Sequence, residues 1–309
     1  MAGQDHLTRV AATGTGELLL YGLTPPPRDQ IAAKVARTVH RARERRNRIR
    51  PDATIVYDLV DEPGHSGRPR PFPFTPTQPP VDYVRTHLRG TDGAVVLYRN
   101  AGAHTEDELR AWLSELEEGT PIVLVGAVSD DVEMATSLPR AQEIARAERP
   151  DAPLGGITIA ERHALHGDEH ERLLRKQESG CSFFVSQVVY DADPAVRLLQ
   201  DYAPAVIRAG MRPAPIVFAL SLCGSAKQLD LLEWLGVAVP DDIPEALRHG
   251  PDPRGESTRH CLEVARRLTT TCRGLGLPFG FAVESVSDLR ADADAAVELA
   301  REVGALLRR

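Results

Sequence analysis

The sequence predicts an α/β protein, and more narrowly a single-domain (β/α)8 TIM barrel with extra helices. Eight short β-prone segments alternate with helical segments along the 309 residues, a pattern typical of parallel strands joined by right-handed crossovers. The length suits one large barrel domain. No strand is followed by G-x-G-x-x-G, and no G-x-x-x-x-G-K-[ST] run occurs, which disfavours a Rossmann or P-loop site.

The first units set the domain limits. Residues 1–16 are small and polar and show no hydrophobic period, so we expect a flexible N-terminal tail and a barrel domain over 17–309. The first strand, 17–23, precedes a proline run at 25–27, which cannot donate to a strand ladder. A helix over 29–50 then follows, because its apolar residues recur on one face: Ile31, Val35, Val39 and Ala42.

The second strand, 53–60, is followed by a segment that composition marks as a long loop. Residues 63–80 contain seven prolines, which favour irregular backbone over a helix or strand. This loop leaves the C-terminal end of a barrel strand, where barrel enzymes keep their chemistry. We therefore expect this segment to be either a lid over the site or an ordinary surface loop.

The remaining units follow from hydrophobic runs and helix signals. Thr105 and Glu108 form a capping box that opens the helix ending near Gly119. The other strands are expected at 93–98, 121–126, 155–159, 183–189, 215–219 and 279–283. The other helices are expected at 81–88, 135–148, 168–179, 193–209, 225–235, 244–249, 255–273 and, by its apolar stripe, 289–303.

Composition narrows the function classes. With 44 acidic and 37 basic residues the net charge is −7, which argues against general nucleic-acid affinity. The basic face of the helix over 29–50 is therefore interpreted as a solvated outer surface. The four cysteines form no short metal-ligand pair, and we expect a reduced, cytoplasmic protein. No apolar run is long enough to span a bilayer.

The strand over 183–189 carries the most informative polar residue. It is apolar on both faces, as in a parallel sheet covered by helices, but Gln187 lies near its C-terminal end. A buried glutamine needs hydrogen-bond partners. Gln187 is therefore either satisfied by neighbouring backbone or a ligand contact at the barrel mouth, by which we mean the C-terminal end of the strands.

Two stretches resemble the methylenetetrahydrofolate reductase family. Residues 155–191 combine a basic helix, a glycine turn and a strand that ends in a glutamine and leads into Tyr190-Asp191; residues 275–287 are similar to the last strand of some members. The resemblance implies an oxidoreductase that transfers hydride from FAD or NAD(P)H to a methylene-folate at the mouth. A reduced folate is the implied partner, and a homo-oligomer is left open.

The resemblance also implies site residues, with one departure. The family places a proton-donating Glu at the end of the first strand, where this chain has Gly22. Acids at other strand ends could replace it: Asp61, Glu62, Glu161 and Glu284. Of these, Glu284 and Glu62 are our catalytic candidates, while Gln187 would hold the pterin edge and Tyr57 would line the ring site.

Cofactor contacts are implied less consistently. Arg175 and Lys176 match a basic pair that binds flavin in the family, and His163 is a further candidate contact by its place after the fifth strand. The family's Arg-Gly-Asp run after the fourth strand is absent, since this chain has Val125-Gly126-Ala127. Flavin-independent barrel reductases, in which hydride passes directly from nicotinamide to folate, also resemble the chain.

Two other functions stay open. One is a divergent barrel that binds folate or another ligand without reducing it, as the missing Glu suggests. The other is a zinc-dependent barrel hydrolase using His163, His166 and His170, three histidines within eight residues. Acidic residues between them suit the first turn of an ordinary helix, so no metal ligand is assigned.

Overall fold

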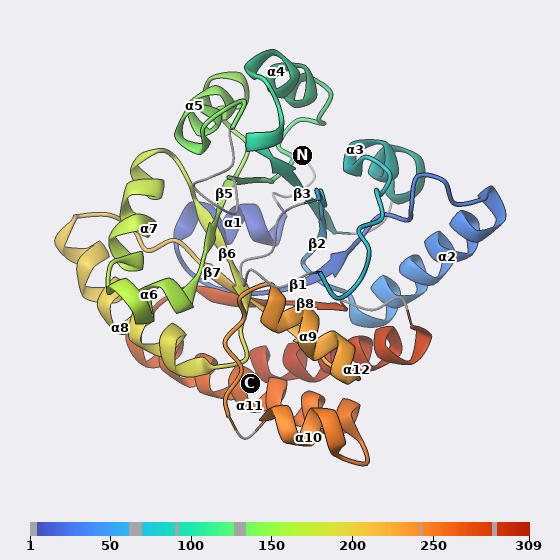
Figure 1. Ribbon diagram of the computed structural model, residues 1–309. Helices are drawn as coiled ribbons and strands as arrows, with labels where there is room; N and C mark the ends of the chain where they lie inside the picture. Colours follow the sequence, from blue (N-terminus) through green and yellow to red (C-terminus); the bar gives the residue numbers. More distant parts are fainter. Residues whose placement is uncertain (1–4, 62–69, 90–92, 127–133, 242, 286–288) are drawn as a thin grey trace.

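The protein is a closed barrel of eight parallel strands surrounded by helices (Figure 1). The computed structural model describes residues 5–61, 70–89, 93–126, 134–241, 243–285 and 289–309. The strands follow one another around the barrel from β1 to β8, and β1 pairs with both β2 and β8. The predicted (β/α)8 class is confirmed.

Every predicted strand has an observed counterpart. The strands are β1 (Glu17–Leu23), β2 (Ala53–Val56), β3 (Ala94–Asn100), β4 (Ile122–Val125), β5 (Leu154–Thr158), β6 (Phe183–Val188), β7 (Ile216–Leu222) and β8 (Phe279–Ser285). The α-helices are α1 (His6–Thr13), α2 (Ala32–Ile49), α3 (Pro80–Tyr83), α4 (Glu106–Ser114), α5 (Leu138–Glu148), α6 (Ala160–His166), α7 (Glu169–Glu178), α8 (Ala192–Arg208), α9 (Ala226–Trp234), α10 (Ile243–His249), α11 (Pro253–Leu275) and α12 (Arg290–Leu307). A π-helical turn (Val84–Leu88) and a 3-10 turn (Ala101–Ala103) complete the set.

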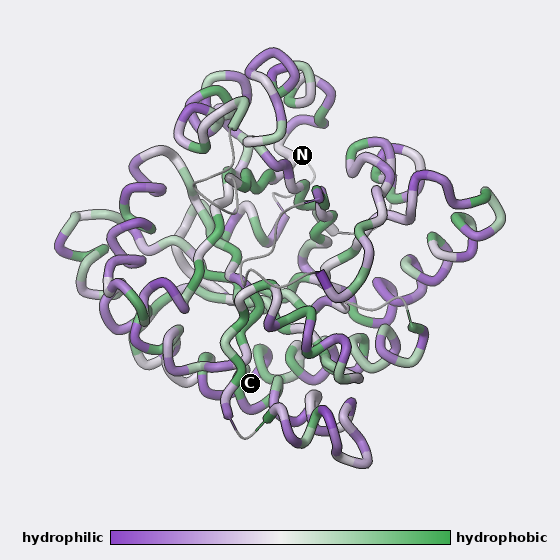
Figure 2. The backbone as a smooth tube through the Cα atoms, in the orientation of Figure 1, coloured by the Kyte–Doolittle hydropathy of each residue, from purple (hydrophilic) through white to green (hydrophobic). Residues whose placement is uncertain are grey.

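Two hydrophobic clusters hold the barrel together. Side chains that alternate along the strands fill its interior: Leu18, Leu20, Ile55, Val96, Val123, Phe183, Val185, Val217 and Ala282. A larger cluster lies between the outer faces of the strands and the apolar faces of the helices. Figure 2 shows this pattern as hydrophobic strands at the centre and hydrophilic outer turns of the helices. The C-terminal strand ends are therefore the place where polar side chains can enter the barrel.

The N-terminal segment differs from the expected tail. Residues 6–13 form α1, which begins where the Asp5 side chain accepts a hydrogen bond from the Thr8 amide and ends at Gly14 in the left-handed conformation. Leu7 and Val10 are fully buried in the interior cluster. They lie three residues apart and so share one helical face, which covers the barrel. Two apolar positions are too few for a helical period to be recognised in sequence.

A second difference is α6. We expected a loop after the fifth strand, but the structure has a helix that ends at Gly167 in the left-handed conformation. This helix is only seven residues long, less than two helical turns, so its sequence has too few repeats for a hydrophobic period to be recognised. It carries three of the residues considered for a site, Glu161, His163 and His166.

Two further observations concern the cysteines and the length of the helices. All four cysteines are unpaired and buried, and burial raises the pKa of the Cys181 thiol to about 12. Among the helices that the structure describes, none combines the length and the apolar character that crossing a bilayer requires.

Candidate functional site

Three polar side chains at the ends of β8, β2 and β3 form what we call the mouth cluster: Glu284, Tyr57 and Tyr98. Glu284 lies near the end of β8, Tyr57 directly follows β2, and Tyr98 lies near the end of β3. The Tyr57 and Tyr98 rings pack edge to face with centroids 4.9 Å apart, and the Tyr57 hydroxyl lies close enough to the Glu284 carboxyl group to lower its pKa. A carboxyl group and two phenols therefore meet at the C-terminal end of the barrel.

Burial sets the protonation behaviour of the mouth cluster. It raises the pKa of Glu284, and the hydrogen bond from Tyr57 opposes this by favouring the carboxylate. Burial, followed by the charge of Glu284, raises the pKa of Tyr57 and Tyr98 well above the ordinary value. Both phenols therefore stay protonated as donors, while Glu284 can hold a proton at a higher pH than an exposed glutamate can.

Gly22 explains where the acid of this barrel lies. A Cβ added at Gly22 would lie 2.8 Å from the Glu284 Cβ and 2.9 Å from a Tyr57 ring carbon. Real Cβ contacts essentially never come that close. Glu284 thus occupies the space beside the first strand, where the resembling family has its acid. The geometry is compatible with our choice of Glu284 as the replacement acid.

Gln187 and Glu161 lie on the opposite side of the mouth, under the end of α9. Gln187 donates to the Leu235 carbonyl at 3.2 Å, and its side-chain oxygen accepts from the Val188 amide at 3.0 Å. Glu161, on α6, accepts from the Ala238 amide at 3.3 Å, and burial raises its pKa. Gln187 keeps one amide hydrogen and one lone pair beyond these bonds.

The described part of the proline-rich loop contacts the end of α9 and the segment after β1. The Arg70 guanidinium lies 4.9 Å from the centre of the Trp234 ring at the end of α9 and 5.2 Å from that of Phe74. Farther along, the Gln78 amide donates to the Pro26 carbonyl after β1. The described part of the loop therefore contacts segments that follow β1 and β7, and its role as a lid stays a prediction. Glu62, our second catalytic candidate, lies outside the described residues.

Arg175 and Lys176 lie on the outside of the barrel. Arg175 is exposed and lies 3.6 Å from the Glu171 carboxylate one turn away. Lys176 donates to the Ile157 carbonyl, and its side chain lies 3.4 Å from a Cβ placed on Gly156, so it packs between α7 and β5. Burial lowers the pKa of this lysine. Held in this way, the pair does not fit a flavin phosphate at the mouth, and its cofactor role stays a prediction.

The histidines separate into two environments. His163 is buried on α6, and its Nε2 lies 3.0 Å from Asp201 Oδ2 on α8. His170, on α7, packs edge to face on His163 with ring centroids 5.4 Å apart. His166 is exposed. The structure therefore groups His163 with His170 and Asp201 on the outer side of the barrel, and His166 is not part of this group.

Sequence reasoning missed two residues of the mouth, Tyr98 and Trp234. Tyr98 has a recognisable signal, because it lies two residues after Val96 and so faces the same interior. The contact of Trp234 with the loop depends on tertiary structure and has no local signal. The mouth as a whole offers a carboxyl group, phenols and an amide, a set able to bind and protonate a polar heterocycle.

Comparisons with known proteins include a solved structure that is similar over almost the whole chain. The chain is similar to an uncharacterized protein from Clostridium thermocellum that binds two copies of 5-methyl-5,6,7,8-tetrahydrofolic acid, with 27% identity and a TM-score of 0.86 over 97% of this chain and 99% of that chain. No protein-family model matches the chain, and no curated protein matches it. The resemblance to methylenetetrahydrofolate reductases thus has no direct support here.

More distant structures show the fold alone. A GH10 endoxylanase retrieved from a sugarcane soil metagenome is 8% identical with a TM-score of 0.54, over 96% of this chain and 99% of that chain. A Schiff-base-forming fructose-1,6-bisphosphate aldolase is 11% identical with a TM-score of 0.50, over 98% and 100%. At such identity they agree with the (β/α)8 architecture and say nothing about the ligand.

Proposed function

We propose that this protein binds a reduced folate of the 5-methyltetrahydrofolate type at the mouth of its barrel. The observation that carries the proposal is the likeness, over nearly the whole of both chains, to a barrel that binds this compound. Such a ligand has a polar bicyclic ring with adjacent donors and acceptors. The mouth offers matching groups in Glu284, Tyr57 and Gln187.

Gln187 is the proposed contact to the pterin edge. Its free amide hydrogen and lone pair can meet an edge that presents both an acceptor and a donor. The bond that it now makes to Leu235 comes from the end of α9, the same helix end that Arg70 contacts from the loop. Ligand entry would therefore involve the loop and the end of α9 together.

The test is a titration of 5-methyltetrahydrofolate into the parent protein and Gln187→Leu, followed by calorimetry, with thermal melting of both. Removing one partner of a buried hydrogen-bonded pair costs roughly 1–3 kcal/mol. We therefore expect affinity to fall roughly tenfold to a hundredfold. A parent protein that binds no reduced folate would overturn the proposal.

Gln177→Leu is a matched control. Gln177 lies on α7 and also makes two side-chain hydrogen bonds, donating to the Arg212 carbonyl at 2.9 Å and accepting from the Tyr202 hydroxyl at 2.6 Å. Its loss should lower the melting temperature without changing folate affinity. If Gln187→Leu behaves in the same way, Gln187 is structural and the folate contact lies elsewhere.

A second candidate function is reduction of a methylene-folate, and the raised pKa of Glu284 favours it. A reductase of this kind needs an acid that keeps a proton near neutral pH. A bound flavin or nicotinamide would supply the hydride. The placement of Arg175 and Lys176 gives no support for flavin, so NAD(P)H is the cofactor that we favour.

Glu284→Gln separates binding from reduction. Glutamine has the shape of the neutral acid and can hydrogen-bond, but it cannot release a proton. If the protein is a reductase, turnover of methylene-tetrahydrofolate with NAD(P)H should fall about 10²–10⁴-fold, the usual contribution of a general acid, while folate affinity changes little. If the parent protein binds folate without turnover under either nicotinamide, the binding function stands alone.

A further inference from the structure

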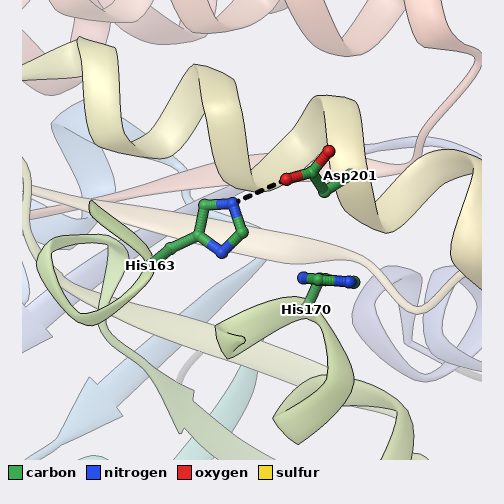
Figure 3. Close-up of side chains that lie close together, drawn as sticks. All are labelled: His163, His170 and Asp201. Carbon is green, nitrogen blue, oxygen red and sulfur yellow. Dashed lines mark hydrogen bonds and ion pairs between the residues drawn. The ribbon is translucent and has the colours of Figure 1, made fainter. Parts of the chain in front are cut away.

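Three helices bring two imidazoles and a carboxylate together outside the barrel. We call this group, made of His163 on α6, His170 on α7 and Asp201 on α8, the helix cluster. One ligand atom from each residue lies within 4.8 Å of the other two. Figure 3 shows the three side chains turned toward one another from their separate helices. The mouth cluster contains none of them.

The helix cluster contains ring nitrogens that lack hydrogen-bond partners. The Asp201 carboxylate accepts hydrogen bonds, so His163 Nε2 must be the donor in their 3.0 Å contact. In neutral His163 this leaves Nδ1 as a bare acceptor. Nδ1 of His163 and Nδ1 of His170 are both buried, and neither has a partner among the residues that the structure describes. Such atoms are rare in folded proteins unless a ligand satisfies them.

We propose that His163, His170 and Asp201 bind a divalent transition-metal ion, with Zn²⁺ the best match. Imidazole nitrogen and carboxylate oxygen are common zinc ligands, at about 2.0–2.2 Å from the ion. Two ligands at that distance on a tetrahedron lie about 3.3–3.6 Å apart, so the His163–Asp201 pair, 3.0 Å apart, would have to open by a few tenths of an ångström. The ion takes the place of the proton that His163 Nε2 and Asp201 share, so the unpartnered atom that it can satisfy is Nδ1 of His170. Asp201, whose side chain is 58% exposed, leaves a fourth position open to water.

The surroundings hold the ligands in place. His163 is almost fully buried, and α6 and α7 both pack against α8. Next to His170, the buried Glu169 carboxylate accepts from the Thr158 hydroxyl at 3.1 Å and the Ile159 amide at 3.2 Å. The start of α7 is thereby tied to the end of β5. The metal would link three outer helices, and this inference does not depend on folate binding.

The experiment uses the full chain without a polyhistidine tag, freed of metal by chelator and dialysis. Zn²⁺ is titrated in by calorimetry, and Co²⁺ serves as an optical probe of tetrahedral coordination. We expect one equivalent per chain, bound more tightly at higher pH because binding displaces protons. His170→Gln and Asp201→Asn should each weaken binding at least ~10-fold, a loss seen even for residues that only support a metal ligand.

His166→Gln is the matched control. His166 belongs to the same sequence run and lies on α6, but it is exposed and outside the helix cluster. This variant should bind both metals as the parent does. Absence of saturable binding by the parent, or equal losses in all three variants, would overturn the proposal. Circular dichroism checks that each variant is folded, and neither ligand variant alters the most buried member, His163.

Discussion

The mouth cluster and the helix cluster both bring ionisable side chains together from separate elements. They differ in whether the polar atoms of those side chains find partners within the cluster. In the mouth cluster Tyr57 stabilises the Glu284 carboxylate and packs on Tyr98, so its members are partners of one another. In the helix cluster the only direct bond joins His163 to Asp201, and two ring nitrogens are left over. Side chains that interact with one another are suited to holding or releasing a proton. Ligand atoms without a partner are suited to binding an added ion.

The largest expected effect concerns the tight packing of the mouth cluster. Gly22→Ala would force a methyl group against Glu284 and Tyr57, and overpacking of this kind typically costs about 1–3 kcal/mol. Chemical denaturation would measure the change in the free energy of unfolding. A loss smaller than the error of that measurement would mean that the mouth is loosely packed, and the contrast with the helix cluster would weaken.

A second glycine provides the control for this change. Gly274 lies in α11, and a Cβ added there meets nothing within 4 Å. Gly274→Ala should therefore stabilise the protein by up to about 1 kcal/mol, the difference in helix propensity between the two residues. Opposite signs at Gly22 and Gly274 would assign the cost to the mouth rather than to the added methyl group itself.

The next effect concerns the hydrogen bond inside the mouth cluster. Tyr57→Phe removes the donor that favours the Glu284 carboxylate, so the pKa of Glu284 should rise further. A glutamate whose pKa is raised on folding contributes stability that is fully present below its unfolded pKa and is lost as pH rises through its folded pKa. The free energy of unfolding of the variant should therefore be roughly 1.5 kcal/mol lower than that of the parent at neutral pH. The difference between the two proteins should be smaller in acid.

Melting curves across the acidic to neutral range would test this dependence. Tyr98→Phe is the comparison variant, because the charge of Glu284 raises the pKa of Tyr98, whereas Tyr98 is not among the groups that shift the pKa of Glu284. It should leave the pH dependence closer to that of the parent. Identical profiles for the two variants would contradict a special role of Tyr57.

The smallest effect is expected in the helix cluster without metal. Asp201 is largely exposed, and ion pairs with an exposed partner contribute less than about 1 kcal/mol. Asp201→Asn should therefore change the free energy of unfolding of the metal-free protein by less than that amount. A larger loss in the absence of metal would show that the His163–Asp201 contact is structural, and would remove the contrast between the two clusters.

The barrel was predictable from sequence because its signals are local and repeated. Each strand is a short apolar run between turn signals, and Glu284, Gln187 and Tyr57 could be placed at strand ends by counting along those runs. The α1 helix was missed because only Leu7 and Val10 reveal its buried face. Asp201 could not be linked to His163 because the two are 38 residues apart on different helices, and only their packing brings them together.

The arrangement of Gly22 beside Glu284 has a consequence for how such barrels diverge. Because the space holds one side chain, an acid cannot be gained on the first strand until the one on the last strand has been lost. Gaining an acid at position 22 alone would crowd the site, and losing the acid at position 284 alone would leave the site without one. Substitutions at the two positions are therefore expected to occur together. Among relatives of this chain, the residues at positions 22 and 284 should covary, with a small residue at one wherever the other is acidic.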